Sequence, residues 1–195
     1  MNRASRTDTP LLPRWPLASL AVAAGMFLFS SLHAQANKPT EYQVKATYLY
    51  NFGQFVRWPS TAAGSLSFSI CVLGQDPFRS ILDATLAGET IDGKTVVAQR
   101  ISTPQEASLC RILFISSSED GQLQQILAAA GKAGVLTVSD MPDFTRRGGM
   151  IQFTRDGNRI RFAVNLTSAE DAGLTLSSEL LKVAITVKRN PQPGD

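Results

Sequence analysis

Residues 41–58 are predicted to form an amphipathic helix, because apolar residues recur there at helical spacing. These residues are Val44, Leu49, Phe52 and Val56. Thr40 is a suitable N-cap, and Gln43 stands at the third position of a capping box. Pro59 disfavours helical geometry at the residue before it, so we expect the helix to end near Trp58.

The rest of the chain alternates short apolar runs at strand spacing with helical segments. Strands are predicted over residues 65–73, 96–101, 111–115, 135–138, 150–155 and 159–165. Helical segments are predicted over residues 77–86, 103–108, 119–132 and 176–187, with Asp76 capping the first of them. Asp156-Gly157-Asn158 predicts a tight hairpin turn. The order indicates one α/β domain: a mostly parallel central sheet of about six strands, helices on both faces, and a β-hairpin near the C-terminus.

The first 36 residues have the layout of a secretory signal peptide. Three arginines precede an apolar run over residues 17–32, and Ala34-Gln35-Ala36 has the small-x-small pattern of a cleavage site. The apolar run is short for a membrane span, so we expect cleavage and export to the periplasm, with no membrane insertion of the mature chain. The domain is then expected over residues 37–189, followed by a flexible tail over 190–195.

Composition argues against several classes of function. Removing the leader's three arginines and one aspartate from the 19 basic and 16 acidic residues leaves a net charge of about +1. No basic block remains that would indicate a nucleic-acid partner. The single histidine, His33, lies in the leader, so the mature domain has no imidazole for a catalytic triad or for zinc. We therefore expect no enzyme activity, no metal and no cofactor.

Two cysteines, Cys71 and Cys110, lie beside strand-like apolar runs. Thiols exported to an oxidising compartment tend to pair, whereas cysteine is also a common buried core residue. The pattern favours one disulfide over two separately buried thiols.

The segment over residues 48–59, YLYNFGQFVRWP, carries five aromatic residues. Aromatic rings bury a large area each, which predicts that this helix packs on the sheet. The alternative is that some rings face outward and form a surface for self-association or for a partner, where aromatic residues and arginine are enriched.

Several segments in their order resemble one known family. They are FVRWP, FSICVLGQDPF, CRILFIS, GVLTVSD, RRGGMIQFTRDGNRIRFAVN and AGLTLSSELLKVA. Over residues 42–187 this series resembles the YfiR-type family of secreted bacterial proteins. The resemblance implies a periplasmic location, a helix-flanked sheet, a dimer, and a disulfide between Cys71 and Cys110. The best-known member has a second cysteine pair in the segment matching residues 144–152, and this chain has none there. Redox control by that second pair is therefore not carried over.

The resemblance also implies a function. The best-known member represses a membrane-bound diguanylate cyclase through the cyclase's periplasmic sensor part, and its loss raises cyclic di-GMP and promotes biofilm. We therefore expect a non-enzymatic, homodimeric negative regulator of such a cyclase. The alternative is a periplasmic small-ligand-binding module that feeds a sensor kinase or another membrane receptor, with Arg57 and Lys182 facing an anionic ligand.

Candidate contact residues for a partner or ligand are arginines, glycines, one lysine and one tryptophan in four stretches of the chain. Each has a structural explanation as well: a solvated charge, a turn before a strand, or a ring sealing the core. The candidates are Arg57, Trp58, Arg147, Gly148, Gly149, Arg159, Arg161 and Lys182.

Overall fold

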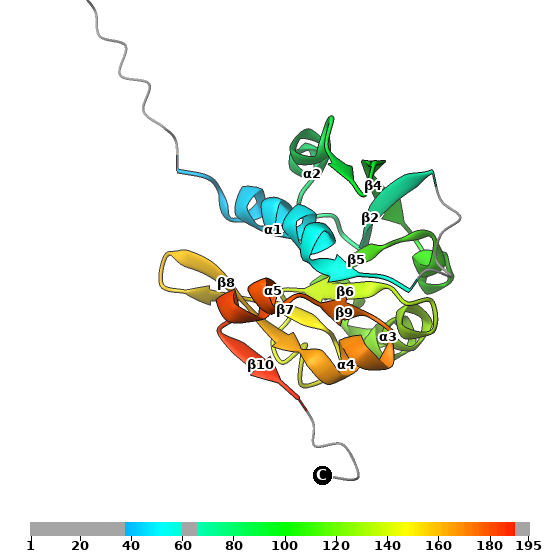
Figure 1. The fold of residues 1–195 in the computed structure, drawn as a ribbon, viewed down its shortest axis with the longest axis vertical. Coiled ribbons are helices and arrows are strands. Elements are labelled where there is room, and N and C mark those ends of the chain that lie inside the picture. Colours follow the sequence, from blue (N-terminus) through cyan, green and yellow to red (C-terminus); the bar gives the residue numbers. More distant parts are fainter. Residues whose placement is uncertain (1–37, 60–65, 190–195) are drawn as a thin grey trace, which may run out of the picture. The chain divides into compact units, whose positions relative to one another are not determined.

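The computed structural model describes residues 38–59 and 66–189 (Figure 1). The predicted leader and the predicted C-terminal tail lie outside the described residues. The described chain forms a mixed α/β domain, as predicted.

The first helix, α1 (Glu41–Phe55), begins with the predicted capping box. The Gln43 amide donates to Thr40 Oγ1 at 3.3 Å, and the Thr40 amide donates to Gln43 Oε1 at 2.7 Å. The helix ends three residues before the predicted position, because Val56 and Arg57 become extended and form strand β1. This two-residue strand pairs antiparallel with β9 (Thr175–Leu176).

Eight strands form the main sheet, in the order β10-β8-β7-β6-β5-β2-β4-β3. Their bounds are β2 Ser67–Leu73, β3 Thr90–Ile91, β4 Lys94–Ile101, β5 Ile112–Ile115, β6 Leu136–Ser139, β7 Ile151–Asp156, β8 Arg159–Asn165 and β10 Thr186–Lys188. The five strands from β7 to β4 are mutually parallel. β7 and β8 form the predicted antiparallel hairpin, β3 closes one edge, and β10 runs parallel to β8 at the other.

Helices cover both faces of the sheet, and side chains alternate between two hydrophobic clusters. On β2, Phe68, Ile70 and Val72 belong to one cluster, whereas Cys71 and Leu73 belong to the other. The first cluster includes residues of α1, α2 (Ser80–Leu86), α4 (Leu166–Asp171) and α5 (Ser178–Val183). The second includes residues of the 3₁₀ helix η2 (Pro104–Leu109) and of α3 (Leu123–Lys132). We call these sides the α1 face and the disulfide face.

The predicted helix over residues 176–187 is present, but only as α5, and its bounds are wrong at both ends. That segment splits into β9, α5 and β10, and α4 precedes it as a helix that the pattern did not predict. The Ser177 hydroxyl caps α5 by accepting from the Leu180 amide at 3.2 Å, so the helix begins only after Leu176. Past Val183 the chain becomes extended. Apolar and polar residues alternate there with a period of two, which is typical of a strand.

The predicted cap at Asp76 is also wrong, since α2 begins four residues later at Ser80. Arg79 has φ of 51°, outside the right-handed helical region, so no helix can run through it. The Asp76 carboxylate instead accepts from the Phe78 amide at 2.8 Å and from Arg100 Nε at 2.9 Å. Similarly, the predicted helix over 119–132 starts as a 3₁₀ helix, η3 (Ser117–Gln122), before α3.

Candidate interaction surface

Most of the aromatic segment packs in the core, which confirms the packing interpretation for those rings. Phe52 is fully buried, and its ring centroid lies 5.1 Å from that of Phe162 and 5.9 Å from that of Phe153. Tyr48 is half-buried beside the same cluster, 5.5 Å from Phe162. Phe55 is the exception, with 41% of its surface exposed at the end of α1.

A buried charge fixes the start of α1. Lys45 is 2% exposed, and its Nζ lies 2.6 Å from Glu41 Oε1 and 2.6 Å from Asp140 Oδ2, just after β6. The ammonium also lies 4.6 Å from the centroid of the Tyr42 ring. Glu41 pairs in addition with Arg155 on β7. These ion pairs join α1 to β7 and to the carboxyl end of β6.

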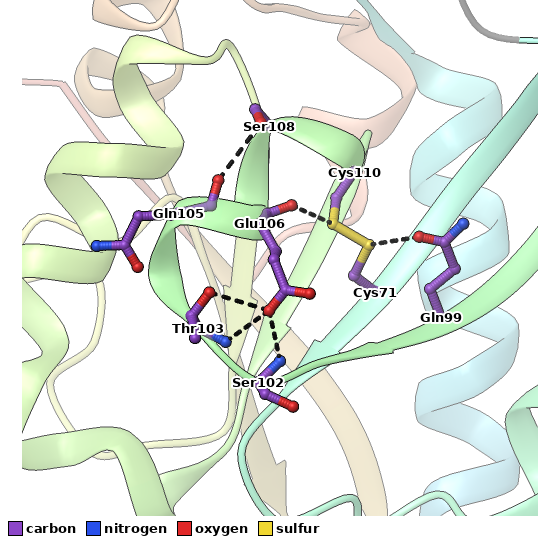
Figure 2. Close-up of a disulfide and its surroundings, with 8 residues drawn as sticks. All are labelled: Cys71, Gln99, Ser102, Thr103, Gln105, Glu106, Ser108 and Cys110. Carbon is purple, nitrogen blue, oxygen red and sulfur yellow. Dashed lines mark hydrogen bonds between the residues drawn. A yellow bond between two sulfur atoms is a disulfide. The ribbon is translucent and has the colours of Figure 1, made fainter.

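The disulfide between Cys71 and Cys110 is present, as favoured from the sequence, with Cα atoms 5.8 Å apart on the disulfide face. Figure 2 shows how the segment before Cys110 is held. Glu106 Oε2 accepts from the amides of Ser102 and Thr103 at 3.0 and 2.9 Å, and these hydrogen bonds lower the pKa of the Glu106 carboxyl. The 3₁₀ helix that carries Cys110 to β2 is therefore anchored at its start.

The first predicted contact group, Arg147, Gly148 and Gly149, forms a turn packed on the protein's own core. Arg147 Nη1 donates to Asp120 Oδ1 at 2.5 Å, and the Arg147 carbonyl accepts from Gln124 at 3.0 Å. A Cβ on Gly149 would lie 2.2 Å from the Phe144 ring, so close packing there leaves no room for a side chain. These contacts are those of a structural turn leading into β7.

Arg159 and Arg161, the second predicted group, share one face of β8, while Ile160, Phe162 and Val164 face the α1 side. Arg159 is exposed, and Arg161 is half-buried opposite Thr154. Among the described residues, neither arginine has an ion-pair partner within 4.0 Å, and the Arg161 Nε atom is buried without a hydrogen bond.

The third group is split between the end of α1 and α5. Arg57 is exposed on β1, and Lys182 is exposed on α5. The Trp58 ring lies edge-on against Phe68, 5.2 Å between centroids, so Trp58 mainly seals the core. The structure therefore places the eight candidate residues on four different segments of the fold and does not gather all of them into one site.

A different surface emerges on the α1 face, along one side of α1. An open groove of about 600 Å³, the hairpin groove, lies between the start of α1 and the β7–β8 hairpin and is lined in part by Val44, Tyr48 and Arg155. A second groove of about 230 Å³, the α1–α5 groove, is lined by residues that include Phe55 and Val183. Tyr48 lines both grooves. Of the candidate residues, Arg159 and Arg161 also line the hairpin groove, whereas Arg57 and Lys182 line neither groove.

Four exposed apolar side chains lie at the α1–α5 groove and the adjoining edge of the sheet. They are Phe55 (41% exposed), Val183 (58%), Ile185 (45%) and Val187 (40%). We call this set the apolar strip. The sequence interpretation missed it, although Val183, Ile185 and Val187 alternate with a period of two, which is a strand signal.

Arg100 on β4 fastens the start of α2. Its guanidinium donates to both carboxylate oxygens of Asp83 at 2.8 and 2.7 Å, and to the Arg79 carbonyl at 2.6 Å. The hydrogen bonds from Arg100 lower the pKa of the Asp83 carboxyl. The hydrogen-bonding groups of Arg100, Asp83 and the Arg79 carbonyl are paired with one another, so we assign these residues a structural role.

Within residues 38–59 and 66–189, no group of three or more histidine, cysteine or acidic side chains could hold a metal ion. In the same part of the chain, no helix has both the length and the apolar character needed to cross a bilayer.

Comparisons with known proteins place the chain in a family. No curated protein matched its sequence. A conserved domain protein from Vibrio cholerae O1 biovar El Tor, known from a crystal structure, aligns with a TM-score of 0.55 and 13% identity. The alignment covers 76% of this chain and 60% of the Vibrio chain, and at this identity it shows a shared fold.

The ABC domain in complex with L-Trp from Streptococcus pneumonia aligns more weakly, with a TM-score of 0.46, 12% identity, and coverage of 66% of this chain and 58% of that chain. A model of the YfiR/HmsC-like family matches residues 42–185, which is most of the described domain. The chain belongs to the YfiR/HmsC-like family, whose members are periplasmic regulators of diguanylate-cyclase signalling and not known enzymes.

Proposed function

We propose that this protein is a periplasmic negative regulator that binds the periplasmic sensor region of an inner-membrane diguanylate cyclase and suppresses cyclic di-GMP synthesis. The observation that carries the proposal is the family match over residues 42–185. The confirmed pair Cys71–Cys110 supports it, since a buried disulfide suits a protein exported to an oxidising compartment.

The mechanism we propose is a shift of population. A regulator that contacts the sensor region more tightly in its inactive conformation stabilises that conformation by the difference between the two affinities. Moving the receptor from 1:99 to 99:1 requires an affinity ratio of about 10⁴, or about 5.5 kcal/mol. A homodimer would present two copies of the surface to a dimeric receptor, and we include dimerisation in the proposal.

The hairpin groove favours a second candidate function. Its volume of about 600 Å³ falls within the range of small-ligand sites, and apolar residues line it together with Lys38, Arg155, Arg159 and Arg161. A small anionic ligand held there would make the protein a sensor that feeds a membrane receptor. The cations available to that ligand are those of the hairpin groove, in place of Arg57 and Lys182.

Deleting the gene and measuring cyclic di-GMP tests the main proposal. We expect the level to rise, and the complete gene supplied from a plasmid to restore it. A plasmid version lacking residues 2–36 is the matched control, because the protein kept in the cytosol cannot reach a periplasmic sensor and should not restore the level. An unchanged cyclic di-GMP level after deletion, with the cyclase expressed, would refute repression. Saturable binding of one anionic metabolite, lost on changing Arg155→Ala, would support the second candidate instead.

A further inference from the structure

Within residues 38–59 and 66–189, strand β10 leaves one edge of the main sheet open. It is the last strand in the sheet order, and β8 is its one partner among these described residues (Figure 1). All three of its residues, Thr186 to Lys188, are exposed. The opposite edge differs, because β3 has only two residues and is tied to β4 by a tight turn.

The main chain of β10 can accept a further strand. The Ile185 amide donates to the Phe162 carbonyl of β8 at 2.9 Å. Main-chain groups of successive residues in a strand point to opposite sides, so Val187 also faces β8. The amide and carbonyl groups of Thr186 and Lys188 therefore point away from the sheet, where a neighbouring strand would meet them.

Register determines which side chains such a strand would meet. Val187 pairs with Val164 and so lies on the α1 face, beside Ile185 and the rest of the apolar strip. Thr186 pairs with Ala163, which places Thr186 and Lys188 on the face that also carries Arg161. A strand added to β10 would thus have apolar neighbours on one face, and Thr186 and the cationic Lys188 on the other.

The apolar strip is more than scattered surface hydrophobicity. Among the described residues, six large apolar side chains are exposed, and four of them lie at the end of α1, on α5 and at β10. Phe55 and Val183 line the α1–α5 groove together. Contiguous apolar surface of this kind is typical of interaction sites.

We propose that the free edge of β10 binds an extended segment of a partner protein as an additional strand, with apolar residues of that segment on the apolar strip and alternating acidic residues on the face that carries Lys188. Pairing of this kind combines main-chain hydrogen bonds with side-chain selection at every second residue. A second copy of this chain is a poorer occupant, because antiparallel pairing of two β10 edges would bring Lys188 close to its own copy. The identity of that partner as the cyclase sensor region rests on the proposed function. The strand site itself does not.

Site-specific photo-crosslinking in cells tests the proposal on the complete chain. The photoreactive residue p-benzoylphenylalanine replaces Thr186, and the matched control carries it at Thr90, which is exposed on the opposite edge strand. We expect an adduct from position 186 and none from position 90. Mass spectrometry of the adduct should locate it in a partner segment that alternates acidic and apolar residues.

Two substitutions separate main-chain pairing from charge. Lys188→Pro removes an outward-pointing amide without touching a hydrogen bond to β8, and should reduce the adduct at least about fivefold, since one net hydrogen bond is worth about 1 kcal/mol. Lys188→Gln keeps the amide and removes the charge, and should reduce the adduct about threefold or less. Near-ultraviolet circular dichroism checks that the Lys188→Pro variant is folded. If that variant is unfolded, crosslinking from position 186 in the otherwise native chain still tests the proposal.

The cyclic di-GMP level distinguishes failure of this inference from failure of the proposed function. Three results would overturn the inference, even where deletion raises cyclic di-GMP. They are the failure to form an adduct at position 186, an adduct with a second copy of this chain only, and a folded Lys188→Pro variant that crosslinks like the native chain. An adduct with a segment of the expected pattern, sensitive to Lys188→Pro, upholds the strand site. If deletion then leaves cyclic di-GMP unchanged, the strand site stands and the proposed function falls.

Discussion

Reducing the disulfide between Cys71 and Cys110 should destabilise the domain by about 4 kcal/mol. The bond closes a loop with a sequence separation of 39 residues. For a loop of about 40 residues, the chain-entropy relation gives about 13 cal/mol/K, which is about 4 kcal/mol at 25 °C. Both cysteine residues are buried, at 0% and 4% exposure, so reductant acts through the unfolded chain. The cost should therefore appear as a shift of the folding equilibrium.

The assay is urea unfolding of the exported protein with and without dithiothreitol, followed by tryptophan fluorescence. With a slope of about 2 kcal/mol/M, typical of a domain this size, the midpoint should fall by about 2 M urea on reduction. The double variant Cys71→Ala/Cys110→Ala is the control, since its midpoint should not respond to reductant. A reduction shift below about 0.5 M in the native chain would show that the loop constraint does not dominate.

Three further changes test other parts of the structure. Lys45→Ala should cost about 3 kcal/mol because it leaves two carboxylates without their buried partner, whereas Lys45→Met, which keeps the packing volume, should cost about half as much in urea unfolding. Gly149→Ala should cost about 2 kcal/mol because its Cβ would overlap a buried phenylalanine ring, while Gly121→Ala, with nothing within 4 Å, should change the unfolding midpoint little. The lowered pKa of Asp83 means that its bond to Arg100 stabilises the fold fully above the unfolded pKa near 4 and is lost as pH falls through the lower folded value. Asp83→Asn should therefore lower the thermal midpoint at pH 6 by a few degrees, and this difference should shrink as the pH falls below 4; a difference unchanged by acidification would contradict the ion-pair origin.

Local signals were sufficient for the parts of the fold that depend on local chemistry. The capping box at Thr40 specifies where α1 begins, and Asp156-Gly157-Asn158 specifies the β7–β8 turn. The alternation of β2 between two buried faces likewise follows from its sequence. These elements were predicted correctly because the residues that decide them are close together in the chain.

Elements decided by distant contacts were predicted poorly. The end of α1 depends on pairing between Val56 and Leu176, more than a hundred residues apart. The Ser177 amide also donates to the Phe55 carbonyl at 2.9 Å, which ties the same two segments together. Asp76 has the residue type of a helix cap, yet one of its carboxylate oxygens forms an ion pair with Arg100 on a neighbouring strand. No pattern within a short window carries that information.

The candidate surface shows the same division. Arg147 and Gly149 were candidate contact residues by residue type, with a turn before a strand as the structural explanation, and the structure uses both to hold a turn against α3 and Phe144. The apolar strip was recoverable in part, because alternation over Val183 to Val187 indicates a strand. That this strand stands at an open edge follows only from the strand order, which sequence patterns do not determine.

The disulfide and the α1–α5 groove lie on opposite faces of the main sheet. Cys71 and Cys110 belong to the cluster on the disulfide face, whereas the residues of α1 and α5 that line the α1–α5 groove pack on the opposite face. Reduction of the disulfide therefore removes no atom from the groove or from β10. If the partner binds at that edge, loss of the disulfide should weaken binding only as far as it raises the unfolded fraction. An intrinsic affinity that fell on reduction while the domain remained folded would instead indicate coupling through β2, β4 and β5, whose side chains reach both clusters.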